Sequence, residues 1–363
     1  MDALGSEARA ESGSAFEFHG RWQEFLPIAA TNLLLIIVTL GFYRFWAKTR
    51  ERKYLWGRTR FIDERLEWAG TCKEMFIGFL IVTAILLPFV LFLNFGLQAM
   101  LLRGEVVLAG VLTIALYLGI LYLAGVALFR ALRYRLSRTY WHGIRGGSEN
   151  PGWAYGVQFV WRTIAGFLPF GLLVPWASAT LWRRRWSAMS FGPHPFEVGD
   201  DPATRGLMGR YLLIYVGTLA IVVVGSLLGL GTMMATAGGG PSTAAPVMMV
   251  LTVLGFYAAF LVFSLAYYAA FLRKMISELR LSTLEFEFTA RTADWLKLIF
   301  GNIGLVIVTL GLGLVFLGYR NWAFFIRHME ATGEISVSRL TQSTTSLRSD
   351  AEGLADAFDI GAI

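Results

Sequence analysis

The chain has 363 residues, of which 56% are hydrophobic and only 16% are charged, and it carries a net charge of +7. Because a soluble domain has about 25% charged residues, this composition excludes an ordinary water-soluble protein. In a membrane protein, a basic excess is more typical of cytoplasmic loops beside anionic lipid than of nucleic-acid binding. The single cysteine, Cys72, excludes an intrachain disulfide and a cysteine metal cluster.

The first fifteen residues mix small and charged residues without an apolar core, so we expect a disordered leader and not a signal peptide. Phe16–Arg21 then alternates as a strand does. From Trp22 to Trp46 the chain is mostly apolar, breaks at Thr39-Leu40-Gly41, and leaves through a helix rich in aromatic and basic residues. We name this segment A1. Its exit is typical of a helix in the membrane interface, with Trp and Tyr at headgroup depth.

Four longer apolar runs follow in two pairs, at about 75–132 and 207–272. The first pair is interrupted only by Arg103-Gly104-Glu105, and the second by a stretch without any charge, 235–246. Each run reaches or exceeds the ~20 residues that cross a bilayer. The two pairs therefore predict four spanning helices joined by short external turns.

Two further segments are similar to A1. Segment A2 covers 153–182, between the helix pairs, and segment A3 covers 295–325, after the second pair. An offset of 270 residues brings Phe16–Arg58 onto Phe286–His328 without a gap. The sequence thus predicts an internal repeat. The repeat segments are about 16–60, 140–190 and 286–328 of a membrane domain 16–328, and 329–363 is expected to be a disordered cytoplasmic tail.

Several motifs carry a resemblance to a known family. They are Phe16-Glu17-Phe18-His19-Gly20, the exit from Thr39 to Ala47, Trp68-Ala69-Gly70-Thr71 with Lys73-Glu74, and Trp141-His142-Gly143-Ile144-Arg145. Over roughly residues 16 to 328 the chain resembles the uncharacterised bacterial inner-membrane family known as YjgN. The resemblance implies a multi-pass protein of the inner membrane. It implies no activity, substrate or cofactor, because the family has no established biochemical function.

The basic residues favour one topology over another. If A1, A2 and A3 all cross the membrane, either orientation leaves a basic cluster outside, against the positive-inside rule. If each segment enters and returns on the cytoplasmic side, every basic cluster is cytoplasmic. We therefore expect an all-α polytopic membrane protein with four to seven transmembrane helices, three related broken or re-entrant segments, and short cytoplasmic β-like hairpins. Seven true spans remain the alternative, with inverted repeats as in many secondary transporters.

Polar residues inside the A segments are candidate pathway or ligand residues. A buried amide is unfavourable unless hydrogen-bonded, and an arginine within the membrane is a functional candidate by default. The alternative is that they only fix helix packing. The three candidates are Asn32, Arg162 and Asn302.

The A segments and their exits hold two further sets of candidate residues. Arginine binds phosphate with two parallel hydrogen bonds, so arginines at the segment exits are candidates for lipid headgroups, with general lipid anchoring as the alternative. These are Arg50, Arg183, Arg184, Arg185 and Arg320. Glycine relieves the backbone restriction that a helix break needs. The glycines at the expected breaks are Gly41, Gly171 and Gly311.

The sequence shows no phosphate loop, dinucleotide fingerprint, nucleophile elbow or paired-histidine zinc motif. We therefore expect no enzyme activity, no cofactor and no metal site. Two functions remain open. One is a transporter or channel for a small or anionic solute. The other is a non-transport factor that binds lipid or a partner protein in envelope assembly. Anionic membrane lipids are the expected partners, nucleic acid is not, and a homo-oligomer is left open.

Overall fold

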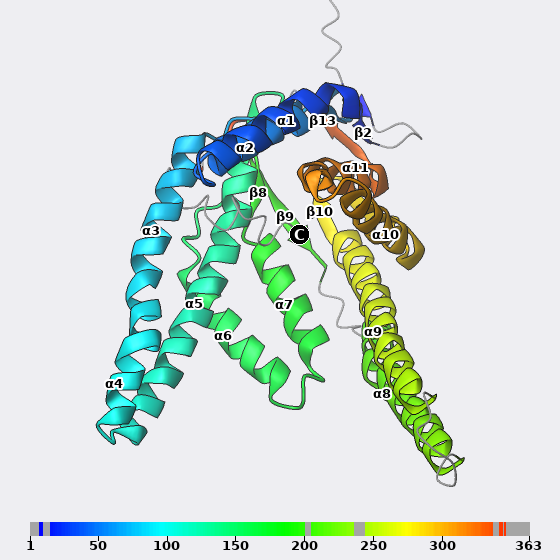
Figure 1. Cartoon of the computed structure of the whole chain (residues 1–363). Helices are drawn as coiled ribbons and strands as arrows, with labels where there is room; N and C mark the ends of the chain where they lie inside the picture. The colour runs from blue at the N-terminus through cyan, green and yellow to red at the C-terminus, as the bar shows by residue number, and fades with distance from the viewer. Residues whose placement is uncertain are drawn as a thin grey trace, which may run out of the picture.

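The computed structural model describes residues 7–9, 15–199, 205–235, 244–336, 341–343 and 345. Within these residues, helix hairpins alternate along the chain with pairs of short strands (Figure 1). The helical elements are α1 (Trp22–Val38), α2 (Arg44–Gly57), α3 (Cys72–Leu91), a π-helical turn η1 (Phe92–Gly96), α4 (Leu97–Leu102), α5 (Val106–Arg138), α6 (Trp153–Phe167), α7 (Val174–Trp186), α8 (Arg205–Ala235), α9 (Ala244–Ser277), α10 (Thr292–Val308), a 3₁₀ turn η2 (Leu312–Phe316) and α11 (Leu317–His328).

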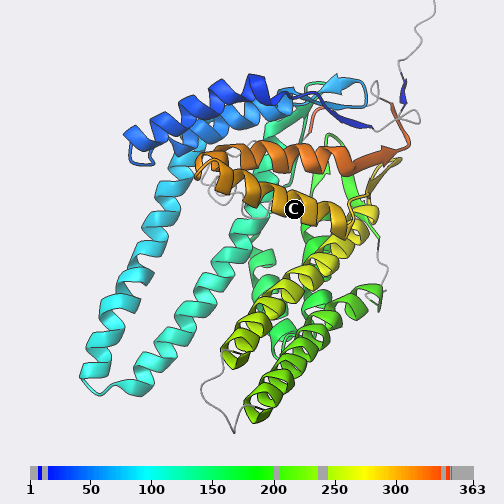
Figure 2. The ribbon, with the colours of Figure 1, turned by 45° about the vertical axis from the view of Figure 1, so that its right-hand side comes forward.

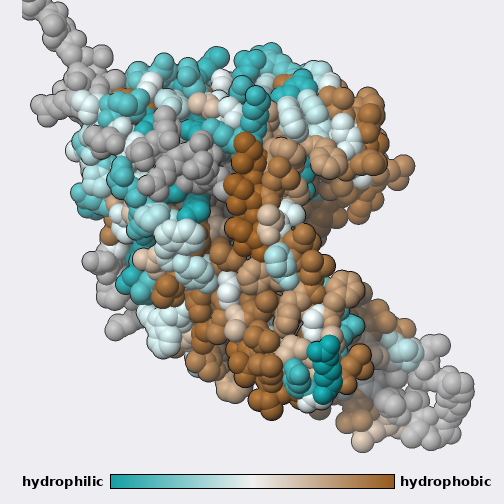
Figure 3. Space-filling model, turned by 90° about the vertical axis from the view of Figure 1, so that its left-hand side faces the viewer, coloured by the Kyte–Doolittle hydropathy of each residue, from teal (hydrophilic) through white to brown (hydrophobic). Residues whose placement is uncertain are grey.

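Four helices in the described part of the chain are long and apolar enough to cross a membrane. They are Cys72–Leu102, Val106–Arg138, Gly206–Gly231 and Pro246–Ser277, and only 6% of the most apolar stretch of each is buried. Figure 3 shows hydrophobic residues over these helices and hydrophilic residues gathered at one end of the molecule. The exposed apolar surface fits contact with lipid.

Each A segment is a pair of shorter helices. Their first helices, α1, α6 and α10, have 17, 15 and 17 residues, which is less than the ~20 residues of a spanning helix. We name the pairs the A1 hairpin (α1–α2), the A2 hairpin (α6–α7) and the A3 hairpin (α10–α11). In Figures 1 and 2 the A1 and A3 hairpins lie across the ends of the long helices, whereas the A2 hairpin runs alongside them, between the two pairs.

The fold is mostly helical, as expected, but it is not all-α, because the short strands between the helices are joined into sheets. Eight strands, from four connections between helices and from the segment after α11, form one antiparallel sheet in the order β12-β11-β10-β9-β8-β7-β6-β5. A two-stranded hairpin is marginal alone and leaves its edges unpaired, so each hairpin pairs with the next. The strands are β1 (Glu7–Arg9), β2 (Phe16–Phe18), β3 (Thr59–Phe61), β4 (Glu64–Arg65), β5 (Glu67–Trp68), β6 (Thr139–Trp141), β7 (Ile144–Gly147), β8 (Ser190–Phe191), β9 (His194–Val198), β10 (Leu279–Leu281), β11 (Leu284–Phe288), β12 (Met329–Thr332) and β13 (Glu334–Ser336).

The A1 and A3 hairpins, from opposite ends of the sequence, pack on each other through aromatic rings. Trp56 stacks on Trp322 with ring centroids 4.0 Å apart, and Phe25 stacks on Tyr319 at 5.2 Å. The indole N–H of Trp322 donates to Thr59 Oγ1 at 2.9 Å, so its one polar atom is satisfied. This aromatic contact joins the first and last segments into one layer at the sheet end of the molecule.

The segment that follows the predicted tail boundary at 329 begins with β12, which continues the sheet by pairing with β11. Further on, Arg145 is 4% exposed and donates from its guanidinium to the carbonyl oxygen and Oγ1 of Thr345. Gln342 Nε2 also donates to the Gly143 carbonyl oxygen at 2.9 Å. Strand pairing and a buried arginine thus hold parts of a segment whose composition predicts disorder. The rest of that tail, and most of the predicted leader, lie outside the described residues.

Candidate anionic-ligand site

The A1 and A3 hairpins break by the same local mechanism. Thr39 Oγ1 donates back to the Leu35 carbonyl oxygen at 2.6 Å and accepts from the Tyr43 N–H at 2.9 Å. Thr309 makes the same pair of contacts in A3, to the Leu305 carbonyl oxygen and the Gly313 N–H. The threonine hydroxyl thus takes over backbone groups that the ending helix leaves unpaired.

A left-handed residue pair follows each break. Gly41 and Gly311 both have φ near +93°, preceded by Leu40 and Leu310 at +51°. At a φ near +93° a side chain would strain the backbone, so the residue that follows each leucine is glycine. These two leucines are 91% and 94% exposed, so each hairpin presents an apolar tip.

The A2 hairpin reaches the same backbone shape with different partners. Gly171 has φ +79° and Phe170 has φ +53°. Here the carbonyl oxygens of the break are bonded by α8, because Tyr211 OH donates to Gly171 at 3.0 Å and Tyr215 OH donates to Phe170 at 3.2 Å. The A2 tip is therefore fastened to a long helix, whereas a Cβ at Gly41 or Gly311 would meet no atom within 4 Å.

In the A1 hairpin, Asn32 and Arg50 are brought together, which the sequence did not indicate. Asn32 is 7% exposed, and its amide donates to the Ala47 carbonyl oxygen at 3.2 Å. Arg50 Nη1 lies 3.4 Å from Asn32 Oδ1 and 3.2 Å from the Tyr43 hydroxyl oxygen. The side chains of Asn32 and Arg50 therefore both have hydrogen-bond partners inside the A1 hairpin.

In the A3 hairpin the corresponding pair is incomplete. Asn302 Nδ2 donates to Asn321 Oδ1 at 3.1 Å. Asn302 Oδ1 and Arg320 Nε, however, are buried without a hydrogen-bond partner among the described residues. Such atoms are unfavourable in a folded protein unless water or a ligand satisfies them.

Arg162 lies in the A2 hairpin, apart from both asparagines. Its guanidinium donates to Gln158 Oε1 and sits 5.8 Å from the ring centroid of Trp176. Each of the three predicted pathway residues thus has its nearest polar partner within its own hairpin. Among the described residues, no hydrogen bond or ion pair joins Asn32, Arg162 and Asn302 to one another.

The arginines at the exit of A2 have three different surroundings. Arg183 makes two parallel hydrogen bonds to Glu278, at 2.8 and 2.9 Å, and both side chains are largely buried. Arg185 is 5% exposed, and Arg184 is exposed. Arg184 is therefore the member of this cluster that can reach a lipid headgroup without unfolding its surroundings.

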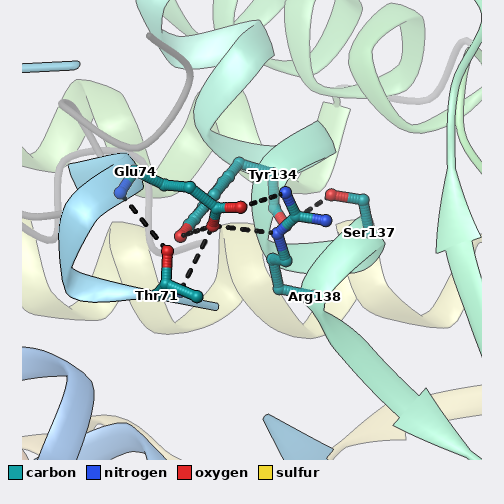
Figure 4. Close-up of polar contacts among 5 residues, drawn as sticks. All are labelled: Thr71, Glu74, Tyr134, Ser137 and Arg138. Carbon is teal, nitrogen blue, oxygen red and sulfur yellow. Dashed lines mark hydrogen bonds and ion pairs between the residues drawn. The ribbon is translucent and has the colours of Figure 1, made fainter. Parts of the chain in front are cut away.

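A polar cluster that the sequence analysis missed lies where α3 begins and α5 ends (Figure 4). Glu74 Oε1 lies 2.6 Å from Arg138 Nη2, and its Oε2 accepts from Arg138 Nε and from the Tyr134 hydroxyl at 3.1 Å. Thr71 and Glu74 also cap the start of α3 reciprocally. The A1 hairpin repeats this design, since Glu24 accepts from Tyr54 and pairs with Arg58 at 2.8 Å. The recurring spacing, an acid in the first turn and Tyr-x₃-Arg at the end of the partner helix, is the signal that could have revealed it.

An open cleft of about 450 Å³ lies between α10 and α11 of the A3 hairpin. We name it the A3 cleft. The Arg291 backbone N–H and the nearby charges of His328 and Lys297 hold the pKa of Asp294 below its ordinary value, so this carboxylate is ionised at neutral pH. Three permanently charged side chains, Lys297, Arg320 and Arg327, line the cleft together with this single acidic residue. The lining is Asp294, Lys297, Leu298, Tyr319, Arg320, Ala323, Phe324, Arg327 and His328.

The cleft can hold an anion by charge and by hydrogen bonds from arginine. In the described part of the chain, no group of three His, Cys, Asp or Glu residues is placed to bind a metal ion. Fold and site together define a mostly helical protein with four helices of spanning length and a basic, aromatic cap at one end.

The comparisons with known proteins agree with this class. The family model described as "Bacterial protein of unknown function (DUF898)" matches residues 13–357, and the chain belongs to this family. It is 30% identical over 223 residues to the Inner membrane protein YjgN of Escherichia coli O157:H7, covering 52% of this chain and 53% of that protein.

A second relative, the protein of the same name from Escherichia coli strain K12, is 28% identical over 132 residues, covering 36% of this chain and 30% of the relative. The matched region thus spans about half the length of the first relative and less of the second. No solved structure matches the chain.

Proposed function

We propose that this protein is an inner-membrane protein that binds anionic phospholipid at the cytoplasmic surface, in a binding role and not a catalytic one. Both relatives are named as inner membrane proteins, which supports this location. The observation that carries the proposal is the build of the A1 and A3 hairpins. Each pairs an exposed apolar tip, at Leu40 or Leu310, with an arginine further along its second helix. Proteins that bind anionic lipid at the membrane interface usually combine apolar side chains that insert into the membrane with basic residues that attract the headgroups.

The proposal includes a topology of four spans, with A1, A2 and A3 as copies of one repeat that stay on the cytoplasmic side. In a Cys72→Ser background, we expect cysteine introduced at the exposed Ser187, after α7, to resist a membrane-impermeant maleimide in intact cells. Cysteine at Arg103, in the turn between the first two spans, should be labelled. Labelling of both positions from outside would contradict the re-entrant arrangement of A2.

Anionic lipid should stabilise the protein measurably. A ligand that binds only the folded state at 100 times its Kd adds about 2.7 kcal/mol. We therefore expect the thermal unfolding midpoint in nanodiscs to rise as phosphatidylglycerol replaces phosphatidylcholine of the same chain length, and the rise to shrink with added salt. Equal midpoints in both lipids at low salt would rule the proposal out.

Transport of a small or anionic solute is the weaker alternative, because Asn32, Arg162 and Asn302 are each bonded within a separate hairpin. Arg162 remains its best candidate, since its Nε is buried without a hydrogen-bond partner among the described residues. Solute flux into proteoliposomes that is lost in Arg162→Ala, with lipid preference unchanged, would favour transport over lipid binding.

A further inference from the structure

The A1 and A3 hairpins differ at the positions that surround their shared arginine. Under the 270-residue offset, Arg50 corresponds to Arg320, and Tyr43 corresponds to Gly313. In A1, the Tyr43 hydroxyl lies within hydrogen-bonding distance of Arg50. In A3 the glycine supplies no such group. Gly301 also leaves room for the guanidinium to lie against α10, because a Cβ there would stand 2.6 Å from Arg320 Nη2.

The acidic residue in the first turn of the hairpin has closer partners in A1 than in A3. In A1, Glu24 is covered by Arg58 at 2.8 Å and by the Tyr54 hydroxyl. The corresponding residues of A3 are His328, which is shorter, and Phe324, which has no hydroxyl. Asp294 instead faces Lys297 at 3.7 Å, and the lysine side chain is 80% exposed.

The same comparison shows that A3 places its positive charges differently around the opening, because Ala323 and His328 stand where A1 has Lys53 and Arg58. Lys297 and Arg327 stand where A1 has Pro27 and Gly57. A3 thus combines an arginine whose Nε is unsatisfied among the described residues, the cations Lys297 and Arg327, and a cleft of about 450 Å³. Because buried polar atoms are nearly always bonded in folded proteins, an acceptor is expected beside Arg320.

We propose that the A3 cleft binds the phosphate group of an anionic phospholipid headgroup, with Arg320 as the central donor and Lys297 and Arg327 beside it. This rests on the lipid-binding function proposed above and names its site. Arginine gives a phosphate oxyanion paired, charge-assisted hydrogen bonds. The acyl chains have an apolar surface on the same hairpin, where Ile303, Ile307 and Leu310 are 47%, 67% and 94% exposed. A free phosphate compound would not use that surface.

The test compares the two hairpins. Phosphatidylglycerol binding to the full chain in neutral detergent is titrated by native mass spectrometry. We expect Arg320→Gln to weaken binding roughly tenfold, and Arg50→Gln, the matched position in A1, to weaken it much less because Arg50 already contacts Asn32 and Tyr43. If Arg320→Gln does not fold, Phe324→Tyr with His328→Arg, which copies the closed A1 end, should weaken binding while keeping every cation of the cleft.

The outcomes separate the site from the function. Equal weakening by Arg50→Gln and Arg320→Gln, or no weakening by the cleft variants, overturns the A3 site while a preference for anionic lipid still stands. No preference of the wild type for phosphatidylglycerol over phosphatidylcholine overturns the proposed function itself. Glycerol 3-phosphate and inorganic phosphate at millimolar concentration are expected not to compete. Displacement of the lipid by either would overturn the lipid headgroup as the ligand and leave a soluble phosphate compound in its place.

Discussion

Replacing Glu74 with glutamine is expected to lower the stability of the protein by about 3–5 kcal/mol, because it removes one partner of a buried ion pair. Arg138 has 8% of its side chain exposed and would remain in place with its charge uncompensated. The substitution also weakens the reciprocal cap that Glu74 makes with Thr71 at the start of α3. The loss should appear as a lower thermal unfolding midpoint in detergent.

The chain offers a matched control for this prediction. Glu24 occupies the same place in its helix and pairs with Arg58 through the same tyrosine and arginine spacing, but these side chains are 39% and 37% exposed. An exposed pair contributes about 0–1 kcal/mol, so Glu24→Gln should have little effect. A double variant, Glu74→Gln with Arg138→Gln, should recover part of the loss because no unpaired charge is left buried. A similar loss for Glu24→Gln and Glu74→Gln would mean that burial does not set the strength of the pair.

Much of this fold could be predicted because its strongest signals are local. The length of the apolar runs separates the four helices that are long enough to span a membrane from the shorter α1, α6 and α10. The Thr-Leu-Gly pattern at Thr39 to Gly41 and at Thr309 to Gly311 marks both breaks, since the threonine hydroxyl and the glycine φ act within one turn of helix. Alternation at Phe16–Phe18 and Leu284–Phe288 also indicates the strands found there.

The parts that could not be predicted depend on residues far apart in the sequence. Nothing near Trp68 indicates that β5 pairs with β6, because the partner lies about seventy residues later, across two long helices. Nor does the resemblance of A2 to A1 indicate that the A2 hairpin runs alongside the spans. In that position, A2 packs along α5 and its break accepts hydrogen bonds from Tyr211 and Tyr215 of α8.

The candidate site could likewise be predicted only in part. The sequence singled out Asn32, Arg50, Asn302 and Arg320 because they are polar and matched under the offset, but it assigned the asparagines to a pathway and the arginines to lipid. The structure puts Asn32 beside Arg50, and Arg320 against Gly301, one residue before Asn302. In A1, Arg50 Nη1 lies within reach of Asn32 Oδ1 and of the Tyr43 hydroxyl, whereas in A3 Asn302 Oδ1 and Arg320 Nε have no hydrogen-bond partner among the described residues. This difference is visible only once the helices are folded back on each other.

Replacing Trp56 with alanine is expected to cost about 3–5 kcal/mol and to loosen α11, which lies more than 250 residues away in the sequence. Trp56 is 7% exposed, and its ring lies 4.0 Å from that of Trp322 and 5.0 Å from that of Trp68, measured between centroids. Its indole N–H also donates to Thr139 Oγ1 at 2.9 Å, which ties the A1 hairpin to the sheet.

Hydrogen exchange can measure this loosening directly, because the amides of an element report its local opening. In Trp56→Ala, the amides of α11 should exchange faster, since the stack on Trp322 is part of what holds the A3 hairpin against A1. Trp22→Ala is the control, because Trp22 is 54% exposed and its loss should leave α11 unchanged. Unchanged exchange of α11 in Trp56→Ala would mean that the A3 hairpin is held by its own sheet strands, β11 and β12, and not by the aromatic contact with A1.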